Sequence, residues 1–149
     1  MSNQDLANIF YDIADMLEIE GVKWKPAAYR KAALTISTLS TDIKKVYEEG
    51  KLRELEGVGD AIAKKIEEYI KTGKVSKHEE LKKKYPIDFT SFRNIQGLGP
   101  KRIYSLYKLL NVKNIDDLKA ALDAHKVRNL PGFGEKSEEE IKENLEYYI

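Results

Sequence analysis

The spacing of apolar residues predicts helices along almost the whole chain. Leu6, Ile9, Phe10, Ile13 and Leu17 recur at intervals of three and four residues, which places them on one face of a helix. The same period recurs within residues 29–36, 62–70, 103–110, 115–122 and 141–148. No run alternates between apolar and polar residues for long enough to predict a strand. We therefore expect an all-α protein.

A nine-residue block occurs three times in the chain, at residues 51–59, 91–99 and 126–134. Each copy reads x-h-Arg-(Glu/Asn)-(Leu/Ile)-x-Gly-h-Gly, where h is an apolar residue, and a segment of helical period follows it. A short helix, a Gly-h-Gly turn and a second helix together form a helix-hairpin-helix. The chain therefore predicts two small helical domains built around this motif, residues 1–77 with the first copy and residues 78–149 with the other two.

The Gly-h-Gly turn suits the binding of a phosphate group. The first backbone N–H groups of the helix after the turn have no partner within that helix, and they carry the positive end of its dipole. Glycine permits a tight turn with positive φ and lets a nucleic-acid strand approach with no Cβ in the way. We expect phosphate contacts at three glycine pairs, Gly57 and Gly59, Gly97 and Gly99, and Gly132 and Gly134. Such contacts touch no base edge, so they would not read the sequence of the nucleic acid.

The residues beside the turns distinguish the three copies. Lys101 and Arg102 directly follow the second turn and add positive charge for a phosphate. Three glutamates at positions 138–140 follow the third turn and would repel a phosphate, so we expect the third hairpin to pack or to bind weakly. We also expect Asp60 to cap the helix after the first turn, and the apolar residue of each turn to point inward. The alternative that the turns only connect helices remains open.

Composition and charge add two points to this picture. The 149 residues, 34% charged and 42% hydrophobic, are typical of a folded protein, and the net charge of +1 does not by itself indicate a nucleic-acid partner. However, residues 1–22 contain five acids and no Lys or Arg, whereas residues 23–45 contain six bases and one acid. This division can leave a basic patch on a nearly neutral protein. The alternative is that these charged residues lie on ordinary solvated helix faces.

Several classes of site are excluded by the residues that the chain contains. It has no cysteine, which excludes disulfides and thiolate metal sites. His78 and His125 lack the spacing of metal ligands, and we expect both at the surface. No apolar run approaches the roughly 20 residues of a membrane span, and the amino terminus lacks the features of a signal peptide. We therefore expect an intracellular protein with no membrane partner.

One lysine on the helix after the first turn has a position suited to chemistry. At about 100° per residue, Lys64 lies opposite the apolar stripe, whereas Lys65 lies at its border, roughly 85° from the centre. Partial burial and cationic neighbours favour the uncharged amine that a lysine nucleophile needs. The alternative is a lysine that covers apolar surface with its methylene groups and keeps its ammonium group in solvent.

Longer segments resemble a known family. Residues 28–33 (Ala-Tyr-Arg-Lys-Ala-Ala), residues 55–59 (Leu-Glu-Gly-Val-Gly) and residues 63–74 resemble the amino-terminal lyase domain of family X DNA polymerases, the polymerase-beta group. Residues 97–100 (Gly-Leu-Gly-Pro) are similar to the fingers or thumb subdomain of that family, and residues 130–137 to its bacterial and archaeal members. The resemblance implies one helical domain that binds the 5′-phosphate side of gapped DNA and a second that binds duplex near the primer terminus.

The resemblance also assigns roles to individual residues. Lys65 matches a lysine that some members use as a Schiff-base nucleophile to remove 5′-deoxyribose phosphate. Trp24 matches an aromatic ring that stacks on a template base. The family's DNA contacts match Lys25, Tyr29, Arg53 and Lys77, to which we add the neighbouring cations Arg30 and Lys64. The carbonyl groups that bind Na⁺ or K⁺ in the family when DNA is bound match Arg53, Leu55, Val58, Arg93, Ile95 and Leu98.

Two departures from the family leave the chemistry open. Ala61 stands where well-studied lyases have a phosphate-binding lysine, and Lys64 replaces an acid beside the nucleophile. The chain therefore predicts a DNA-binding region, with an active 5′-deoxyribose-phosphate lyase or a protein-association module as alternatives.

The polymerase chemistry of the family would lie outside this chain. A two-metal nucleotidyl-transfer site needs clustered acids on a sheet, and a helical chain offers none, so Mg²⁺ would belong only to the palm of a longer parent. The chain ends within a helical pattern with no stop signal, which favours a fragment. We expect the amino-terminal region of a repair polymerase that acts in base excision repair. We expect it to be a monomer that binds gapped or nicked double-stranded DNA. We expect it to lie in the cytoplasm in association with the nucleoid, and the sequence predicts no definite cofactor.

Overall fold

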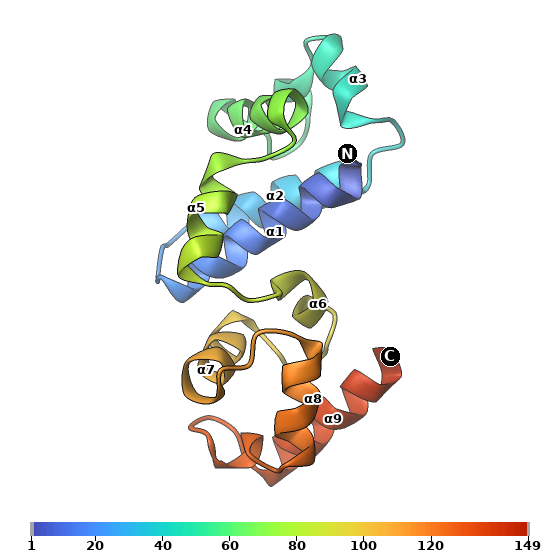
Figure 1. Ribbon diagram of the computed structural model, residues 1–149. Coiled ribbons are helices and arrows are strands. Elements are labelled where there is room, and N and C mark those ends of the chain that lie inside the picture. Colours follow the sequence, from blue (N-terminus) through green and yellow to red (C-terminus); the bar gives the residue numbers. More distant parts are fainter. Residues whose placement is uncertain (1, 149) are drawn as a thin grey trace. The chain divides into compact units, whose positions relative to one another are not determined.

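Helices form all the regular structure in residues 2–148, the part of the chain that the computed structural model describes (Figure 1). The expected all-α class is confirmed. The chain divides into two compact units, Met1–Tyr85 and Pro86–Ile149. The sequence predicted a boundary after residue 77, which would divide α5 (Ser76–Lys84). In the structure the boundary follows Tyr85, so the whole of α5 belongs to the first unit.

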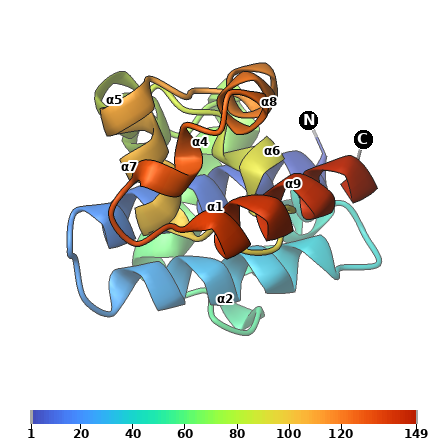
Figure 2. The same cartoon turned by 90° about the horizontal axis from the view of Figure 1, so that it is seen from below.

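The first unit is built on two long helices that lie side by side (Figures 1 and 2). Its elements are α1 (Asn3–Ile19), α2 (Lys25–Ser37), α3 (Ile43–Glu48), a 3₁₀ helix (Leu52–Glu54), α4 (Asp60–Thr72) and α5. Phe10 of α1 meets Tyr29 of α2 edge to face, with ring centroids 5.7 Å apart. Both rings are buried, so the apolar stripe predicted for residues 6–17 is the core face of α1.

Helix α5 completes the first unit by packing on α1. His78 and Leu81 of α5 are buried, and the Nε2 atom of His78 lies 2.9 Å from a carboxylate oxygen of Asp12. The surface position expected for His78 is therefore wrong, because a carboxylate 66 residues away gives the buried ring a hydrogen-bond partner. Beyond α5, the Tyr85 hydroxyl donates to Glu20 at 3.0 Å, which ties the end of the unit to α1.

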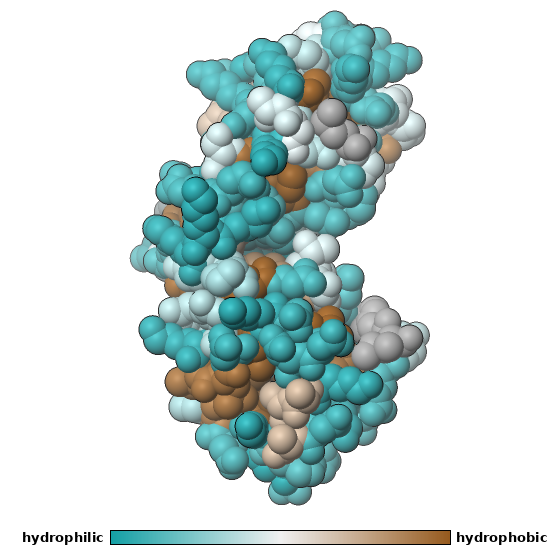
Figure 3. All heavy atoms as spheres, viewed as in Figure 1, coloured by the Kyte–Doolittle hydropathy of each residue, from teal (hydrophilic) through white to brown (hydrophobic). Residues whose placement is uncertain are grey.

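The second unit contains two consecutive hairpins. Its elements are α6 (Phe89–Arg93), α7 (Pro100–Leu110), α8 (Ile115–Asp123), a 3₁₀ helix (Val127–Asn129) and α9 (Glu135–Tyr148). Its core includes Phe92, Ile103, Leu106, Leu118, Leu122 and Ile141. The face in Figure 3 is mainly hydrophilic, with a hydrophobic patch at the place of α7. Leu109, a residue of α7, is 53% exposed.

Candidate nucleic-acid interface

All three nine-residue blocks fold into a short helix, a glycine turn and a longer helix. The short helices are the 3₁₀ helix Leu52–Glu54, α6 and the 3₁₀ helix Val127–Asn129, and the longer ones are α4, α7 and α9. The first glycine of each turn, Gly57, Gly97 or Gly132, has a φ of +78°, +97° or +82°. A residue with a Cβ rarely adopts this conformation, so the turn itself requires glycine there.

The backbone conformation of the second glycine in the first two turns does not require glycine. Gly59 and Gly99 have extended backbones and stand just before the first residues of α4 and α7. A Cβ placed on either one would meet no atom within 4 Å, so the space above these turns is open. Neither helix start carries a capping side chain, which leaves its first amides available to an anion. The expectation that Asp60 caps α4 is wrong, because Asp60 is the first residue inside the helix.

The apolar residue between the glycines anchors two of the turns. Val58 and Leu98 are buried, as expected, and they hold the first and second turns against their units. Phe133 of the third turn is only half-buried. The Arg102 guanidinium lies over its ring, 4.9 Å from the centroid, so a cation rather than an apolar core covers part of this residue.

The third hairpin satisfies its own polar groups. The Gly134 amide donates to the Ser137 hydroxyl at 2.9 Å. Glu138 is 2% exposed and accepts hydrogen bonds from the backbone N–H of Arg128 at 2.7 Å and from its Nε at 2.9 Å. Burial alone would raise the pKa of Glu138, but hydrogen bonds from His125 and Arg128 outweigh burial and lower it. Glu138, one of the acids expected to repel a phosphate, is therefore a buried hydrogen-bond acceptor within the hairpin.

The Asp60 carboxylate lies at the start of α4, directly after the turn of the first hairpin. The Arg53 guanidinium contacts Asp60 at 2.8 Å and Glu67 at 3.5 Å, and the Lys64 ammonium lies 3.2 Å from Asp60. The hydrogen bond from Arg53, followed by that from Lys64, lowers the pKa of Asp60. Two cations expected to bind DNA are thus held by an acid of the same hairpin. The second hairpin has Pro100 at the equivalent position and no acid there.

Comparison with known proteins agrees with this geometry. Residues 1–75 match a family described as Helix-hairpin-helix domain, and residues 89–146 match one described as SAM-like Helix-hairpin-helix tandem. The chain belongs to the helix-hairpin-helix family. The expected kinship with the amino-terminal region of family X DNA polymerases is confirmed by the relatives that the chain matches.

Two of these relatives are polymerases. The chain is 37% identical over 146 residues to "DNA polymerase/3'-5' exonuclease PolX" of Bacillus subtilis (strain 168), a match that covers 97% of this chain and 25% of that protein. It is 30% identical over 122 residues to "DNA polymerase lambda" of Arabidopsis thaliana, covering 78% of this chain and 22% of that protein. The helix-hairpin-helix chain therefore spans about a quarter of the length of these relatives.

Around the first helix-hairpin-helix, the structure separates the predicted residues of α2 into two groups. Trp24 is 86% exposed, with a φ of +70° at the start of the helix, and Lys25 beside it is exposed. In contrast, the Tyr29 ring lies in the core, where burial raises the pKa of its hydroxyl. The Arg30 guanidinium pairs with Asp15 at 2.9 Å and with Glu18 of α1. Trp24 and Lys25 are thus exposed to solvent, whereas Tyr29 and Arg30 mainly join α2 to α1.

The predicted nucleophile lies where the helical wheel placed it. Lys65 of α4 is half-buried, and Lys64 is exposed. One turn further along α4, the Glu68 carboxylate accepts hydrogen bonds from the amide and hydroxyl of Ser76 at the start of α5. These hydrogen bonds, and then the nearby charge of Lys65, lower the pKa of Glu68. Lys77, which is half-buried, follows directly in the first turn of α5.

The carbonyl groups predicted to bind a monovalent cation lie on or beside the first two turns. The Leu55 carbonyl accepts the Val58 amide at 3.1 Å, and the Ile95 carbonyl accepts the Leu98 amide at 3.2 Å. Each of these oxygens has a second lone pair that a cation could use. Arg53 and Arg93 occupy the same place in their repeats, two residues before Leu55 and Ile95. Within residues 2–148, no cluster of His, Asp or Glu side chains forms a metal site.

The cations after the second turn have different surroundings. Lys101 is exposed. Arg102, however, donates hydrogen bonds to two carbonyl groups of the protein, that of Gly97 at 3.0 Å and that of Gly132 at 3.1 Å. The sequence indicated the position of Arg102 beside a turn but not these partners, one of which lies 30 residues away.

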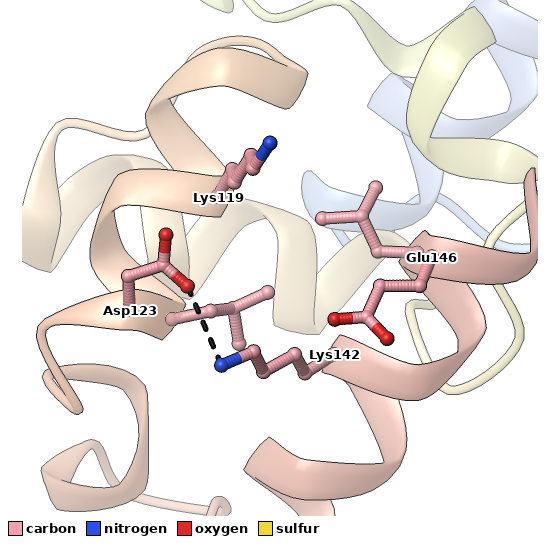
Figure 4. A pocket seen from close by; sticks show the side chains of 6 residues that line it. Lys119, Asp123, Lys142 and Glu146 are labelled. Carbon is pink, nitrogen blue, oxygen red and sulfur yellow. Dashed lines mark ion pairs between the residues drawn. The ribbon is translucent and has the colours of Figure 1, made fainter. Parts of the chain in front are cut away.

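A pocket between α8 and α9 contains none of the predicted site residues (Figure 4). Lys119, Asp123, Lys142 and Glu146 line it, and Lys142 lies 3.4 Å from Asp123. Because both signs of charge are present in equal number among these four, the pocket does not select an anion. Within residues 2–148, no helix has both the length and the apolar character that a membrane span requires.

Proposed function

We propose that this chain is the DNA-binding region of a family X repair polymerase and that it holds gapped or nicked duplex DNA by its backbone phosphates. The observation that carries the proposal is the pair of open helix starts after Gly59 and Gly99, where no side chain caps the helix and no atom fills the space above the glycine. The names of the relatives, both DNA polymerases, support a nucleic acid as the anion.

The physical basis is the amide array at each helix start. A hydrogen bond to a charged group contributes about 1.5–3 kcal/mol. One hairpin alone therefore has a low affinity for DNA, and two hairpins on the same DNA together give a higher affinity. Because these groups contact phosphates, binding is independent of base sequence and falls as salt rises. Trp24 offers an exposed ring that can stack on a base left unpaired at a gap, which favours gapped over intact duplex.

The proposal has three further parts. The protein acts as a monomer in the cytoplasm, on the DNA of the nucleoid. The carbonyl groups of the first two turns bind Na⁺ or K⁺ once a phosphate is in place, because the phosphate supplies the negative charge that the carbonyl groups lack. Polymerase chemistry with Mg²⁺ belongs to a palm domain elsewhere in a longer parent.

The test replaces the open glycines with valine. Gly59→Val and Gly99→Val should each weaken binding to a nicked duplex about tenfold, because the new side chain blocks the approach of the phosphate. Neither glycine has a positive φ and neither has a neighbour within 4 Å, so both variants should keep the wild-type circular dichroism spectrum. Gly134→Val is the matched control, and its affinity should stay within twofold of wild type, since Ser137 already occupies the Gly134 amide. Unchanged affinity in both folded variants would overturn the proposal.

A second candidate function is a 5′-deoxyribose-phosphate lyase that uses Lys65. Lys65 is half-buried on α4, and its charge acts on Glu68, which accepts hydrogen bonds from Ser76. These surroundings favour Lys65 over the exposed Lys64 as the nucleophile. The amine would attack the C1′ aldehyde of an incised abasic site and release water to form an imine.

A further inference from the structure

Arg102 connects the two hairpins of the second unit. Its Nη1 atom donates to the Gly97 carbonyl at 3.0 Å and its Nη2 atom to the Gly132 carbonyl at 3.1 Å. These two glycines hold the same place in their repeats, the first glycine of each turn, and both have positive φ. One guanidinium thus links equivalent points of two turns that are 35 residues apart in the sequence.

The long helix of the third hairpin also supports the second turn. Asn144 of α9 donates from its side-chain amide to the Gln96 carbonyl at 2.8 Å. The Cγ1 atom of Ile141 lies 3.6 Å from the position that a Cβ of Gly97 would take. The second turn is therefore held from the side of α9 and by Arg102, in addition to its own buried Leu98.

Several polar groups of the third hairpin are already engaged within the protein. Its Gly134 amide is engaged by Ser137, and its Arg128 is engaged by the buried Glu138. Its exposed acids, Glu139 and Glu140, would repel a phosphate. The same hairpin still provides the Gly132 carbonyl and the Phe133 ring to Arg102.

We propose that Arg102 is a positioning residue for phosphate binding at the second hairpin, and that the third hairpin is a brace rather than a second phosphate cradle. This inference rests on the proposed function. By holding the Gly97 and Gly132 carbonyl groups together, Arg102 keeps the second turn in the conformation that presents the amides after Gly99. The preorganised turn then loses less conformational entropy when a phosphate binds.

The chemistry of arginine distinguishes this role from a direct phosphate contact. A guanidinium has separate N–H groups that reach two carbonyl groups at once while its plane stacks on a ring, as Arg102 does with Phe133. A lysine ammonium is a single point charge and cannot do both, yet it serves well as a phosphate contact. Arg102→Lys therefore keeps the charge and removes the bridge.

The experiment compares three variants for their affinity to a nicked duplex at several salt concentrations. Arg102→Lys and Arg102→Ala should both weaken binding, by a similar factor of about five, because both break the bridge. Lys101→Ala, the exposed neighbour, is the control for charge: it should lower the slope of log K against log salt by about one. If Arg102→Lys binds like wild type while Arg102→Ala does not, Arg102 acts by its charge on DNA and the inference fails.

A readout without DNA separates this inference from the proposed function. In ¹H–¹⁵N spectra of the free protein, Arg102→Lys should shift the amides of both Gly97 and Gly132, while Lys101→Ala should leave Gly132 unchanged. Phe133→Leu, which keeps Arg102 and removes only the ring, should shift Gly97 as well, and it covers the case in which Arg102→Ala does not fold. No shift at Gly132 in Arg102→Lys would overturn the bridge. Failure of the wild-type protein to bind DNA would instead overturn the proposed function and leave the bridge standing.

Discussion

The Arg53 guanidinium donates two hydrogen bonds to a single oxygen of Asp60, from Nη2 at 2.8 Å and from Nε at 3.1 Å. Asp60 is the first residue of α4, directly after the open glycine of the first hairpin. The carboxylate therefore occupies cations that a phosphate at this helix start would otherwise attract. In the proposed function, an incoming phosphate would therefore compete with Asp60 for Arg53 and Lys64.

Replacing this acid should strengthen DNA binding. Asp60→Asn removes the negative charge and frees Arg53 and Lys64, and we expect an affinity for nicked duplex roughly two- to fivefold higher at low salt. The gain should shrink as salt increases, because these groups are solvent-exposed. Fluorescence anisotropy with a labelled duplex measures both effects.

The control for Asp60→Asn is Asp116→Asn. Asp116 is an exposed acid in the first turn of α8, away from the glycine turns in sequence, and the substitution makes the same change in net charge. Its effect on affinity should be smaller than that of Asp60→Asn. Equal gains in affinity from the two variants would mean that only the net charge of the protein affects its affinity for DNA, and that Asp60 does not compete with DNA at the hairpin.

Lyase chemistry at Lys65 should be detectable by covalent trapping. Borohydride reduces an imine to a stable amine, so wild-type protein incubated with an incised abasic duplex should form a cross-linked band on a denaturing gel. Lys65→Ala should lose this band, because the attacking amine is gone. Lys64→Ala should keep it, since Lys64 is exposed on another face of α4. A band that persists in Lys65→Ala would assign the chemistry to another amine.

The Trp24 ring should contribute to the recognition of gaps. Trp24→Ala should weaken binding to a gapped duplex about fivefold or more and leave binding to intact duplex within twofold, because only an unpaired base can stack on the ring. Trp24→Phe should retain most of the preference for the gap. Tyr147→Ala removes another aromatic residue that is 84% exposed and should change neither affinity. An equal loss on gapped and intact duplex in Trp24→Ala would contradict a stacking role.

The buried Glu138 should make the second unit sensitive to acid. The pKa of Glu138 is lower in the folded protein than in the unfolded chain, so its charged form contributes stability above the unfolded value of about 4.3, and this stability is lost as pH falls through the lower folded value. Glu138→Gln should cost about 2 kcal/mol of unfolding free energy at pH 7, since the hydrogen bonds from Arg128 lose their charged acceptor.

Urea unfolding at pH 7 and at pH 3.5 measures this contribution. The difference between wild type and Glu138→Gln should be smaller at the lower pH, which lies below the unfolded value of about 4.3, because the stability that the charged form contributes decreases there. Glu139→Gln, the exposed neighbour on α9, should differ from wild type by less than about 0.5 kcal/mol at either pH. A Glu138→Gln effect that is the same at both pH values would mean that the charge of Glu138 does not stabilise the fold.

The sequence by itself determined the helices, the three glycine turns and the border position of Lys65. These features depend on residues within a few positions of one another: an apolar period of three to four, and glycines where φ is positive. The sequence did not give the uncapped start of α4, because Asp60 was expected to cap it. Kinship with family X polymerases could be predicted for the same reason, since its motifs are short runs of consecutive residues.

Only the tertiary structure decided which charged residues face a ligand and which are already engaged. Arg30 pairs with Asp15, and His78 with Asp12, across distances in the sequence that no local pattern encodes. The pairing of His78, the burial of Leu81 and the hydrogen bond from Tyr85 to Glu20 join α5 to the first unit. Arg102 reads as a phosphate contact in the sequence, yet its guanidinium bridges two turns, because the fold brings the Gly97 and Gly132 carbonyl groups within reach of one side chain. A side chain's type limits what it can bind, but its partner depends on which backbone and side-chain groups the folded chain places beside it.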